Sequence, residues 1–238
     1  MASVIRLYVD HPLGVGQSVP LNREQSHYLF GVMRRGVGEV LELFNGRDGE
    51  WLARVVQAGK RNAILLCESK SKPMMLPPDL WMMFAPIKKA RTDFIVEKAT
   101  EMGAAQILPV QTDFTNSERI RQDRLQNHAL EAAEQCGGTY VPPVMELQKL
   151  SKLLDGWDDR HIMFCDENRV GEAVALSQQP GPWAILIGPE GGFSPAERER
   201  LEAMPQAQGV SLGPRILRAD TAAVAALALW QTSLGDWQ

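Results

Sequence analysis

Two stretches of the sequence place glycine-rich or small-residue segments next to side chains that can carry charge. In the first, residues 184–197, an apolar run ends in Gly-Pro-Glu-Gly-Gly (188–192), and Ser194, Pro195 and Glu197 then form the start signal of a helix. Glycines after a strand let a ligand approach the backbone, so that free N–H groups can bind a base or a carboxylate. The alternative is a tight turn that binds nothing. The spacing matches neither GxGxxG nor the P-loop pattern, so a Rossmann dinucleotide site and a P-loop lack their fingerprints.

The second stretch, residues 212–223, contains Arg215, Arg218 and Asp220 among apolar and small residues. Charged groups beside a buried element are costly unless they are paired or used. They indicate either a site that acts on a ligand or a structural Arg218–Asp220 pair, with Asp220 or Thr221 as the N-cap of the last helix. The residues alone leave both interpretations open.

Alternating strands and helices must position these two stretches. Apolar runs bounded by turn signals predict strands at residues 80–85, 106–110, 161–165, 183–187 and 209–212. Helices are expected at 91–102, with Gly103 as the C′ residue, at 118–136, after each of the strands 161–165 and 183–187, and from the last strand to the end of the chain. This order predicts an α/β domain with a mainly parallel sheet.

The first third of the chain has a different pattern. Short apolar runs at 4–9, 40–44, 51–56 and 63–67 predict a small β-barrel or sandwich, with a hairpin loop at Asn-Gly-Arg-Asp-Gly (45–49). Asn22 and Gln25 form a capping pair for one helix. The proline-rich sequence KSKPMMLPP at 70–78 suits neither a strand nor a helix interior. We therefore expect two domains, residues 1–72 and 73–238.

Composition favours an ordinary globular protein, with 45% hydrophobic and 23% charged residues. The formal charge of −4 conceals an asymmetry, because residues 1–72 sum to +3 and residues 73–238 to −7. The three cysteines show no paired spacing, so neither a zinc site nor any other metal site is expected. A membrane-spanning run and a signal peptide are also not expected, which predicts a cytoplasmic protein.

The two charged stretches carry a family resemblance. LIGPEGGFSPAE at 186–197 and LGPRILRADTAAVAALALWQ at 212–231 closely resemble the paired C-terminal motifs of the ribosomal RNA uridine-N3 methyltransferases of the RsmE family. His27-Tyr28, with residues 32–35 and 44–46, resembles the family's N-terminal RNA-binding module, which is similar to a PUA domain. Residues 98–103 and 131–137 resemble its middle motifs. The resemblance covers nearly the whole chain.

This resemblance implies a SPOUT-type domain with a C-terminal trefoil knot, an S-adenosylmethionine (SAM) site in the knot, and a homodimer that acts on 16S ribosomal RNA or the small ribosomal subunit. The cofactor-binding residues that it implies are Gly188, Pro189, Glu190, Gly191, Leu212, Gly213, Ile216 and Leu217, and the loop after Cys165 would supply a third wall. Two departures stand out. Asp220 replaces the usual Glu, and Gly-Gly-Thr at 137–139 stands where many members have Arg, which puts an RNA or interface contact in doubt.

The implied chemistry is methyl transfer from a sulfonium to uracil N3, whose lone pair becomes useful as its proton leaves and charge spreads onto O2 and O4. Arg218 is the expected catalytic cation for that charge. Glu190 and Asp220 are the expected catalytic acids, which take the proton or orient the base. RNA contacts are expected from three cations of the basic first domain, Arg23, Arg34 and Arg35.

Other interpretations remain at this point. The chain could be a non-catalytic RNA-binding protein of ribosome assembly, a 2′-O-ribose RNA methyltransferase of the same superfold, or a SAM enzyme for a protein or small molecule. Lys88, Lys89 and Arg91 either bind phosphate or form a solvated first helical turn.

Overall fold

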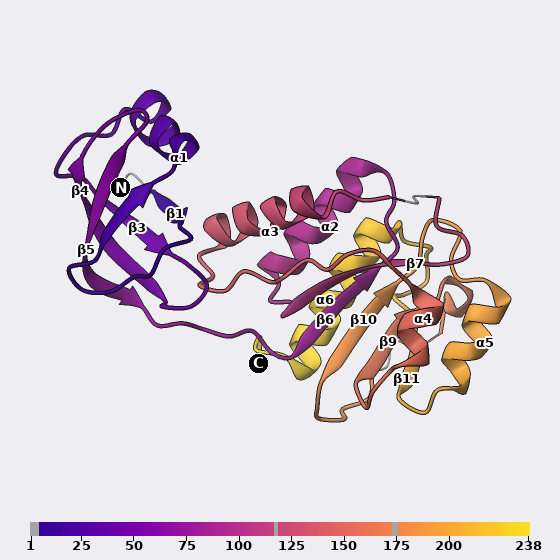
Figure 1. Ribbon diagram of the computed structural model, residues 1–238. Helices are drawn as coiled ribbons and strands as arrows, with labels where there is room; N and C mark the ends of the chain where they lie inside the picture. The colour runs from indigo at the N-terminus through magenta and orange to yellow at the C-terminus, as the bar shows by residue number, and fades with distance from the viewer. Residues whose placement is uncertain (1–4, 117–118, 173–175) are drawn as a thin grey trace. The chain divides into compact units, whose positions relative to one another are not determined.

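The computed structural model describes residues 5–116, 119–172 and 176–238. The chain forms two compact units, Met1–Leu76 with Ala133–Val141, and Pro77–Ala132 with Pro142–Gln238 (Figure 1). The return of residues 133–141 to the first unit was not expected from the sequence, which placed residues 73–238 in one domain. None of the helices in the described part of the chain has the length and hydropathy to cross a membrane.

The first unit is built on a five-stranded sheet in the order β1-β3-β4-β5-β2. Its strands are β1 (Arg6–Tyr8), β2 (Ser18–Leu21), β3 (Val40–Phe44), β4 (Glu50–Gln57) and β5 (Ala63–Lys72). β1 and β3 are parallel, whereas the other pairs are antiparallel. The expected exclusion of residues 70–72 from a strand is wrong, because Lys70 and Lys72 pair with the start of β4 and extend β5.

Local signals in the first unit are confirmed. Asn22 caps α1 (Arg23–His27), with its Oδ1 accepting from the Gln25 N–H at 2.8 Å while the Gln25 Oε1 accepts from the Asn22 N–H at 3.1 Å. Gly46 and Gly49 adopt φ angles of 73° and 81°, as the hairpin loop requires. A π-helix, η1 (Tyr28–Val32), continues α1.

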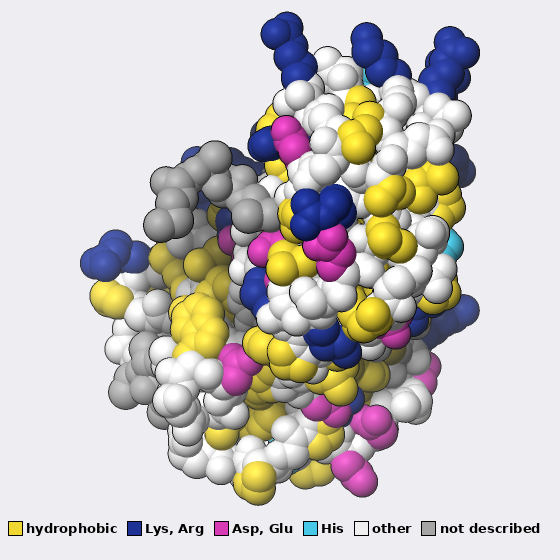
Figure 2. All heavy atoms as spheres, turned by 90° about the vertical axis from the view of Figure 1, so that its left-hand side faces the viewer, with side chains coloured by type: hydrophobic (Ala, Val, Ile, Leu, Met, Phe, Trp, Pro, Cys, Tyr) yellow, Lys and Arg dark blue, Asp and Glu magenta, His cyan; other side chains and the backbone are white. Residues whose placement is uncertain are grey.

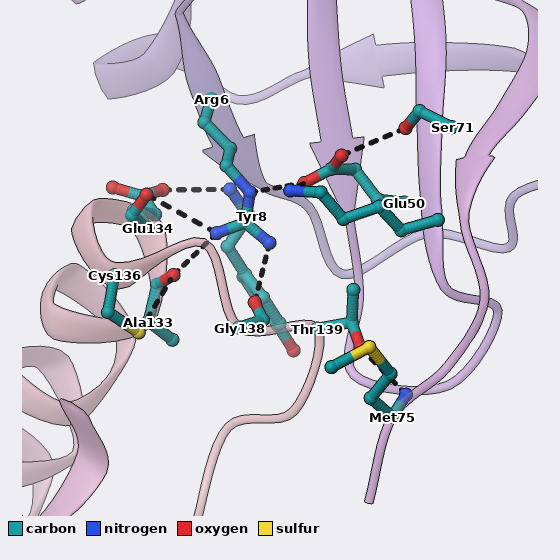
Figure 3. Close-up of polar contacts among 11 residues, drawn as sticks. Arg6, Tyr8, Glu50, Ser71, Met75, Ala133, Glu134, Cys136, Gly138 and Thr139 are labelled. Atoms are coloured by element: carbon teal, nitrogen blue, oxygen red, sulfur yellow. Dashed lines mark hydrogen bonds and ion pairs between the residues drawn. The ribbon is translucent and has the colours of Figure 1, made fainter. Parts of the chain in front are cut away.

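A buried arginine fastens residues 133–141 to this sheet (Figure 3). The Arg6 guanidinium donates to the Glu50 carboxylate and to the carbonyls of Ala133, Glu134 and Gly138. The Arg6 and Glu50 side chains are 8% and 0% exposed. Burial raises the pKa of Glu50, but hydrogen bonds from Arg6, Ser71 and Lys72 outweigh it and hold the pKa below its usual range. The Gly-Gly-Thr departure at 137–139 therefore lies in a segment that supplies a carbonyl to Arg6.

The second unit contains a six-stranded sheet in the order β11-β9-β10-β6-β7-β8, and its strand pairs are parallel. The strands are β6 (Leu80–Phe84), β7 (Gln106–Gln111), β8 (Gln148–Lys149), β9 (His161–Cys165), β10 (Trp183–Ile187) and β11 (Ala207–Val210). β10 is buried throughout, and hydrophobic residues of neighbouring strands pack with it in the core. The predicted α/β class with a mainly parallel sheet is confirmed.

The helices of this unit are α2 (Lys89–Glu101), α3 (Gln122–Cys136), α4 (Leu150–Asp155), α5 (Pro195–Ala203) and α6 (Ala219–Leu234). Gly103 ends α2 with a φ of 79°, as predicted. α3 begins at Gln122 instead of residue 118, which lies outside the described residues. Where an α-helix was expected after β9, the described residues form the short 3-10 helix η2 (Glu167–Arg169). The strand expected at 209–212 is shifted toward the N-terminus, to Ala207–Val210.

Candidate active site

A cavity of about 260 Å³ lies where β9, β10 and β11 end. Cys165, Ile187 and Val210, the last residues of these three strands, line it, together with Ala219 and Ala222 of α6. Open parallel sheets commonly bind ligands beyond the carboxyl ends of their strands. The second unit therefore places a candidate ligand site where both charged stretches of the sequence meet.

The turn after β10 forms the first wall and is held by the start of α5. Ser194 caps α5 as predicted, since its Oγ accepts from the Glu197 N–H at 3.2 Å and the Glu197 carboxylate accepts from the Ser194 N–H at 2.9 Å. The Ser194 hydroxyl also donates to Asp113 at 2.6 Å, which ties the turn to the loop after β7. Gly192 has a φ of 69°, a conformation that favours glycine.

The loop after β9 forms a second wall through Cys165, Asp166, Glu167 and Val170. The Asp166 carboxylate is nearly fully buried and pairs with Arg198 Nε of α5 at 3.0 Å. Burial raises the pKa of the Cys165 thiol to about 12, so this thiol is protonated at neutral pH and is a poor nucleophile. Among the described residues, no cluster of His, Cys, Asp and Glu is arranged to hold a metal ion.

The loop before α6 forms the remaining wall and carries Arg218. Arg218 is exposed, lines the cavity and is the N-cap residue of α6 through its backbone. Within the described part of the chain, its guanidinium makes no hydrogen bond or ion pair. The alternative Arg218–Asp220 pair is therefore wrong, and so is the placement of the N-cap at Asp220 or Thr221. The helix begins earlier than expected, and Asp220 lies in its first turn.

Asp220 pairs instead with Arg91, in the first turn of α2. The Arg91 Nη1 is 2.7 Å from Glu190 Oε1, and the Arg91 Nε is 3.7 Å from Asp220 Oδ2. One guanidinium thus joins the two acids that the sequence analysis selected. Arg91 itself was expected to bind phosphate or to be solvated. The pattern Lys-Lys-Ala-Arg gave no signal for this bridge, because its partners are 99 and 129 residues away in the sequence.

Most of the expected cofactor residues surround this cavity. The lining residues among them are Gly188, Pro189, Glu190, Leu212, Ile216 and Leu217. Gly191, Gly213 and Asp220 are not among the described residues that line it. Gly213 has a φ of 114°, so it shapes the loop between β11 and Leu217 through its backbone.

The three expected RNA-binding arginines lie on the first unit, in the segment from α1 to β3. Arg23 and Arg34 are exposed, and Arg35 forms an ion pair with Glu39 at 3.4 Å. Arg34 follows the π-helix and has a φ of 54°, in the left-handed region that non-glycine residues rarely adopt. Exposed Tyr28, Val32 and Met33 precede it. Figure 2 shows Lys and Arg side chains projecting from this unit among hydrophobic side chains.

Two family models match this chain. Residues 74–231 match the family model described as an RNA methyltransferase domain, and residues 21–66 match the model described as an RNA methyltransferase PUA domain. The fold and the cavity beyond its strands thus define an RNA methyltransferase with a PUA-like N-terminal unit.

Curated relatives and solved structures narrow the class. Ribosomal RNA small subunit methyltransferase E of Bacillus subtilis is 30% identical, over 89% of each chain, and that of Rickettsia conorii is 29% identical, over 94% of this chain and 93% of the relative. The crystal structure of the Neisseria gonorrhoeae methyltransferase E bound to S-adenosyl methionine has a TM-score of 0.88 and 29% identity, and covers 99% of this chain and 100% of that chain. The chain belongs to the ribosomal RNA small subunit methyltransferase E (RsmE) family.

Proposed function

We propose that this protein transfers a methyl group from SAM to N3 of a uridine in 16S ribosomal RNA. The observation that carries the proposal is the cavity beyond β9, β10 and β11, which joins the glycine-rich turn at 188–192 to the Arg218 loop. Membership of the RsmE family and the likeness to a SAM-bound methyltransferase E support it.

The residues present fit SAM. Ile187, Val210 and Leu212 offer an apolar wall for an adenine ring, and the glycine turn offers backbone groups for polar edges. Glu167 and Glu190 place carboxylates at the same cavity, and these are suitable acceptors for ribose hydroxyls and an ammonium group. When bound, SAM supplies an activated methyl electrophile. The proposed cofactor residues are Gly188, Pro189, Glu190, Gly191, Leu212, Gly213, Ile216 and Leu217.

Arg218 is the proposed catalytic cation. Uracil N3 becomes nucleophilic as its proton leaves, and the negative charge then spreads onto O2 and O4. A guanidinium that lines the cavity and has no partner among the described residues can donate to a developing oxyanion without first breaking another ion pair. Holding N3 in line with the methyl group supplies further rate enhancement, up to about 7–11 kcal/mol of the barrier.

Glu190 and Asp220 are the two proposed acids of the site, and they have different roles. Glu190 lines the cavity, so we assign it the contact with the N3 proton or with the edge of the base. Asp220 pairs with the Nε of the same Arg91 whose Nη1 pairs with Glu190, and it is the second acid of the site. Arg91 is then a positioning residue, because it holds the Glu190 carboxylate without lining the cavity.

The two domains of the proposal are residues 1–72, which bind RNA, and residues 73–238, which bind SAM and carry the knot. Arg23, Arg34 and Arg35 are the proposed phosphate contacts of the first domain. The protein acts in the cytoplasm, where ribosomes are assembled.

We also propose a homodimer. α6 is apolar over most of its length, and its Val224, Ala225, Ala228 and Leu229 are only half-buried in a single chain. A second copy would cover this face. Sedimentation at micromolar concentration should show a dimer, and a stable monomer would contradict this part of the proposal.

The decisive experiment uses 16S ribosomal RNA and small ribosomal subunits from cells that lack this protein. Purified protein and methyl-labelled SAM should place the label on one nucleotide, and mass mapping should identify it as N3-methyluridine. A 2′-O-methylated ribose would instead indicate a 2′-O-ribose RNA methyltransferase of the same superfold. SAM binding without transfer to RNA would reject the proposed substrate, and failure to bind SAM would favour a non-catalytic assembly protein.

A further inference from the structure

A second cavity in the same unit, of about 340 Å³, lies between the N-terminal turns of α2 and α3. Ile87, Lys89 and Thr92 line it from the α2 side, and Arg121, Arg124 and Leu125 line it from the α3 side.

The charged side chains that are described in the lining of this cavity are all basic. Four cations line it, Lys89, Arg119, Arg121 and Arg124, and none of the described lining residues is acidic. Arg124 pairs with Asp93, which accounts for one positive charge. Arg121 pairs with Asp123, but the two side chains are 74% and 65% exposed, and so open a pair gives little stability and leaves Arg121 free to bind an anion. The first turn of α2 contains no acidic residue, so its helix dipole adds to the positive potential.

The cationic cavity and the candidate active site are separated by a third depression, which is lined by Pro86, Ile87, Lys88, Asn116, Pro189 and Glu190. It shares Pro86 and Ile87 with the cationic cavity, and Pro189 and Glu190 with the cavity beyond the strands. A ligand that reaches Glu190 can therefore extend along the α2 start into the cationic cavity.

We propose that the cationic cavity binds backbone phosphates of the RNA next to the target uridine. This inference rests on the proposed function and adds a substrate subsite to it. A uridine that reacts at N3 must leave its base pair or stack, and its flanking phosphates must then be held while the base enters the site. The cations of this cavity lie next to the depression that Glu190 lines, so they are suitably placed to hold these phosphates. Contacts to phosphates fix the position of a nucleic acid whatever its sequence.

The test removes two exposed cations of the cavity, in the variant Lys89→Gln with Arg121→Gln. The matched control, Lys149→Gln with Lys152→Gln, removes the same charge from β8 and α4, outside this cavity. Filter binding of 16S ribosomal RNA over a range of KCl concentrations should show a slope of log K against log salt that is flatter by about 0.7–0.9 for each lost phosphate contact. The control should bind RNA like the unmodified protein.

Three further measurements separate the outcomes. SAM affinity by calorimetry and the thermal midpoint should not change, and kcat/KM for RNA should fall together with RNA affinity, since the cavity binds the substrate and not the cofactor. Charge reversal in Lys89→Glu should weaken RNA binding more than Lys89→Gln. Unchanged RNA affinity and salt slope, or an equal loss in the control, would overturn the subsite. The proposed function fails separately, if the unmodified protein binds RNA but places no methyl group on N3.

Discussion

Arg6 of the first unit and Arg218 of the second are chemically identical side chains in opposite surroundings. Arg6 is almost fully buried and divides its donors among one carboxylate and three carbonyls. Arg218 is exposed at the edge of a cavity and makes no ion pair in the described part of the chain. A guanidinium whose donors are already used stabilises the fold, whereas one whose donors are free can bind a ligand. Arg91, which bridges two carboxylates at the second site, is intermediate.

The largest effect, on stability, is expected from replacing Arg6, whose guanidinium donors are already used within the fold. Arg6→Met leaves the Glu50 carboxylate buried and without its main partner, which should lower the free energy of unfolding of the first unit by about 3–5 kcal/mol. Urea unfolding measures this loss. The double variant Arg6→Met with Glu50→Gln removes both charges and should recover part of the stability. Equal stability of Arg6→Met and the unmodified protein would contradict the structural role.

Acid should weaken the same cluster without any substitution. The folded pKa of Glu50 is lowered, so its contribution to stability is present above the ordinary glutamate pKa of about 4.3 and is lost as the pH falls through the folded value. At pH values below about 4, the urea concentration at the unfolding midpoint should therefore decrease. This decrease should be smaller in Glu50→Gln.

Arg218→Ala should act on the reaction instead of the fold. Loss of one preorganised donor should lower kcat/KM by about two to three decades, while SAM affinity and the urea midpoint change little. Arg218→Lys should restore only part of the rate, because an ammonium lacks the planar fork of a guanidinium. A strongly destabilised Arg218→Ala protein with near-normal single-turnover methylation would show that Arg218, like Arg6, stabilises the fold and is not catalytic.

Arg91→Gln should have a smaller effect on the same reaction. It releases Glu190 without removing it, so we expect a loss of about tenfold in kcat, below the hundredfold that a 1 Å displacement of a reacting group can cost. Glu190→Gln should cost more than Asp220→Asn, and the Asp220 effect should nearly vanish in the Arg91→Gln background. Additive effects of Arg91 and Asp220 would show that they act independently.

The smallest effect per residue is expected on the surface of the first unit. Arg34→Ala with Arg35→Ala should flatten the slope of log K against log salt for RNA by about 0.7–0.9 per contact, without changing SAM affinity. Arg54→Ala removes one positive charge from β4 of the same unit, and its slope should change by less than the value expected for one phosphate contact. If the double variant keeps both its affinity and its slope, this surface does not bind RNA.

Sequence reasoning succeeded where a few adjacent residues determine the structure. The capping pairs Asn22–Gln25 and Ser194–Glu197 are each three residues apart, and both form as predicted. The short strands β2 and β8 were missed, because two to four residues carry too little periodicity to stand out. The bridge from Arg91 to Glu190 was also missed, since it depends on how α2 packs against the sheet and not on the residues near Arg91.

The return of residues 133–141 also affects how the chain is synthesised. The first unit is translated first, but a nascent chain that ends at Leu76 lacks the three carbonyls that receive Arg6. About 65 more residues must emerge before they are available, which takes on the order of 3–13 s at about 5–20 residues per second. Until then, Arg6 and Glu50 are paired only with each other and with groups from the β-sheet. The first unit can therefore be completed only after residues 77–132 of the second unit have been synthesised.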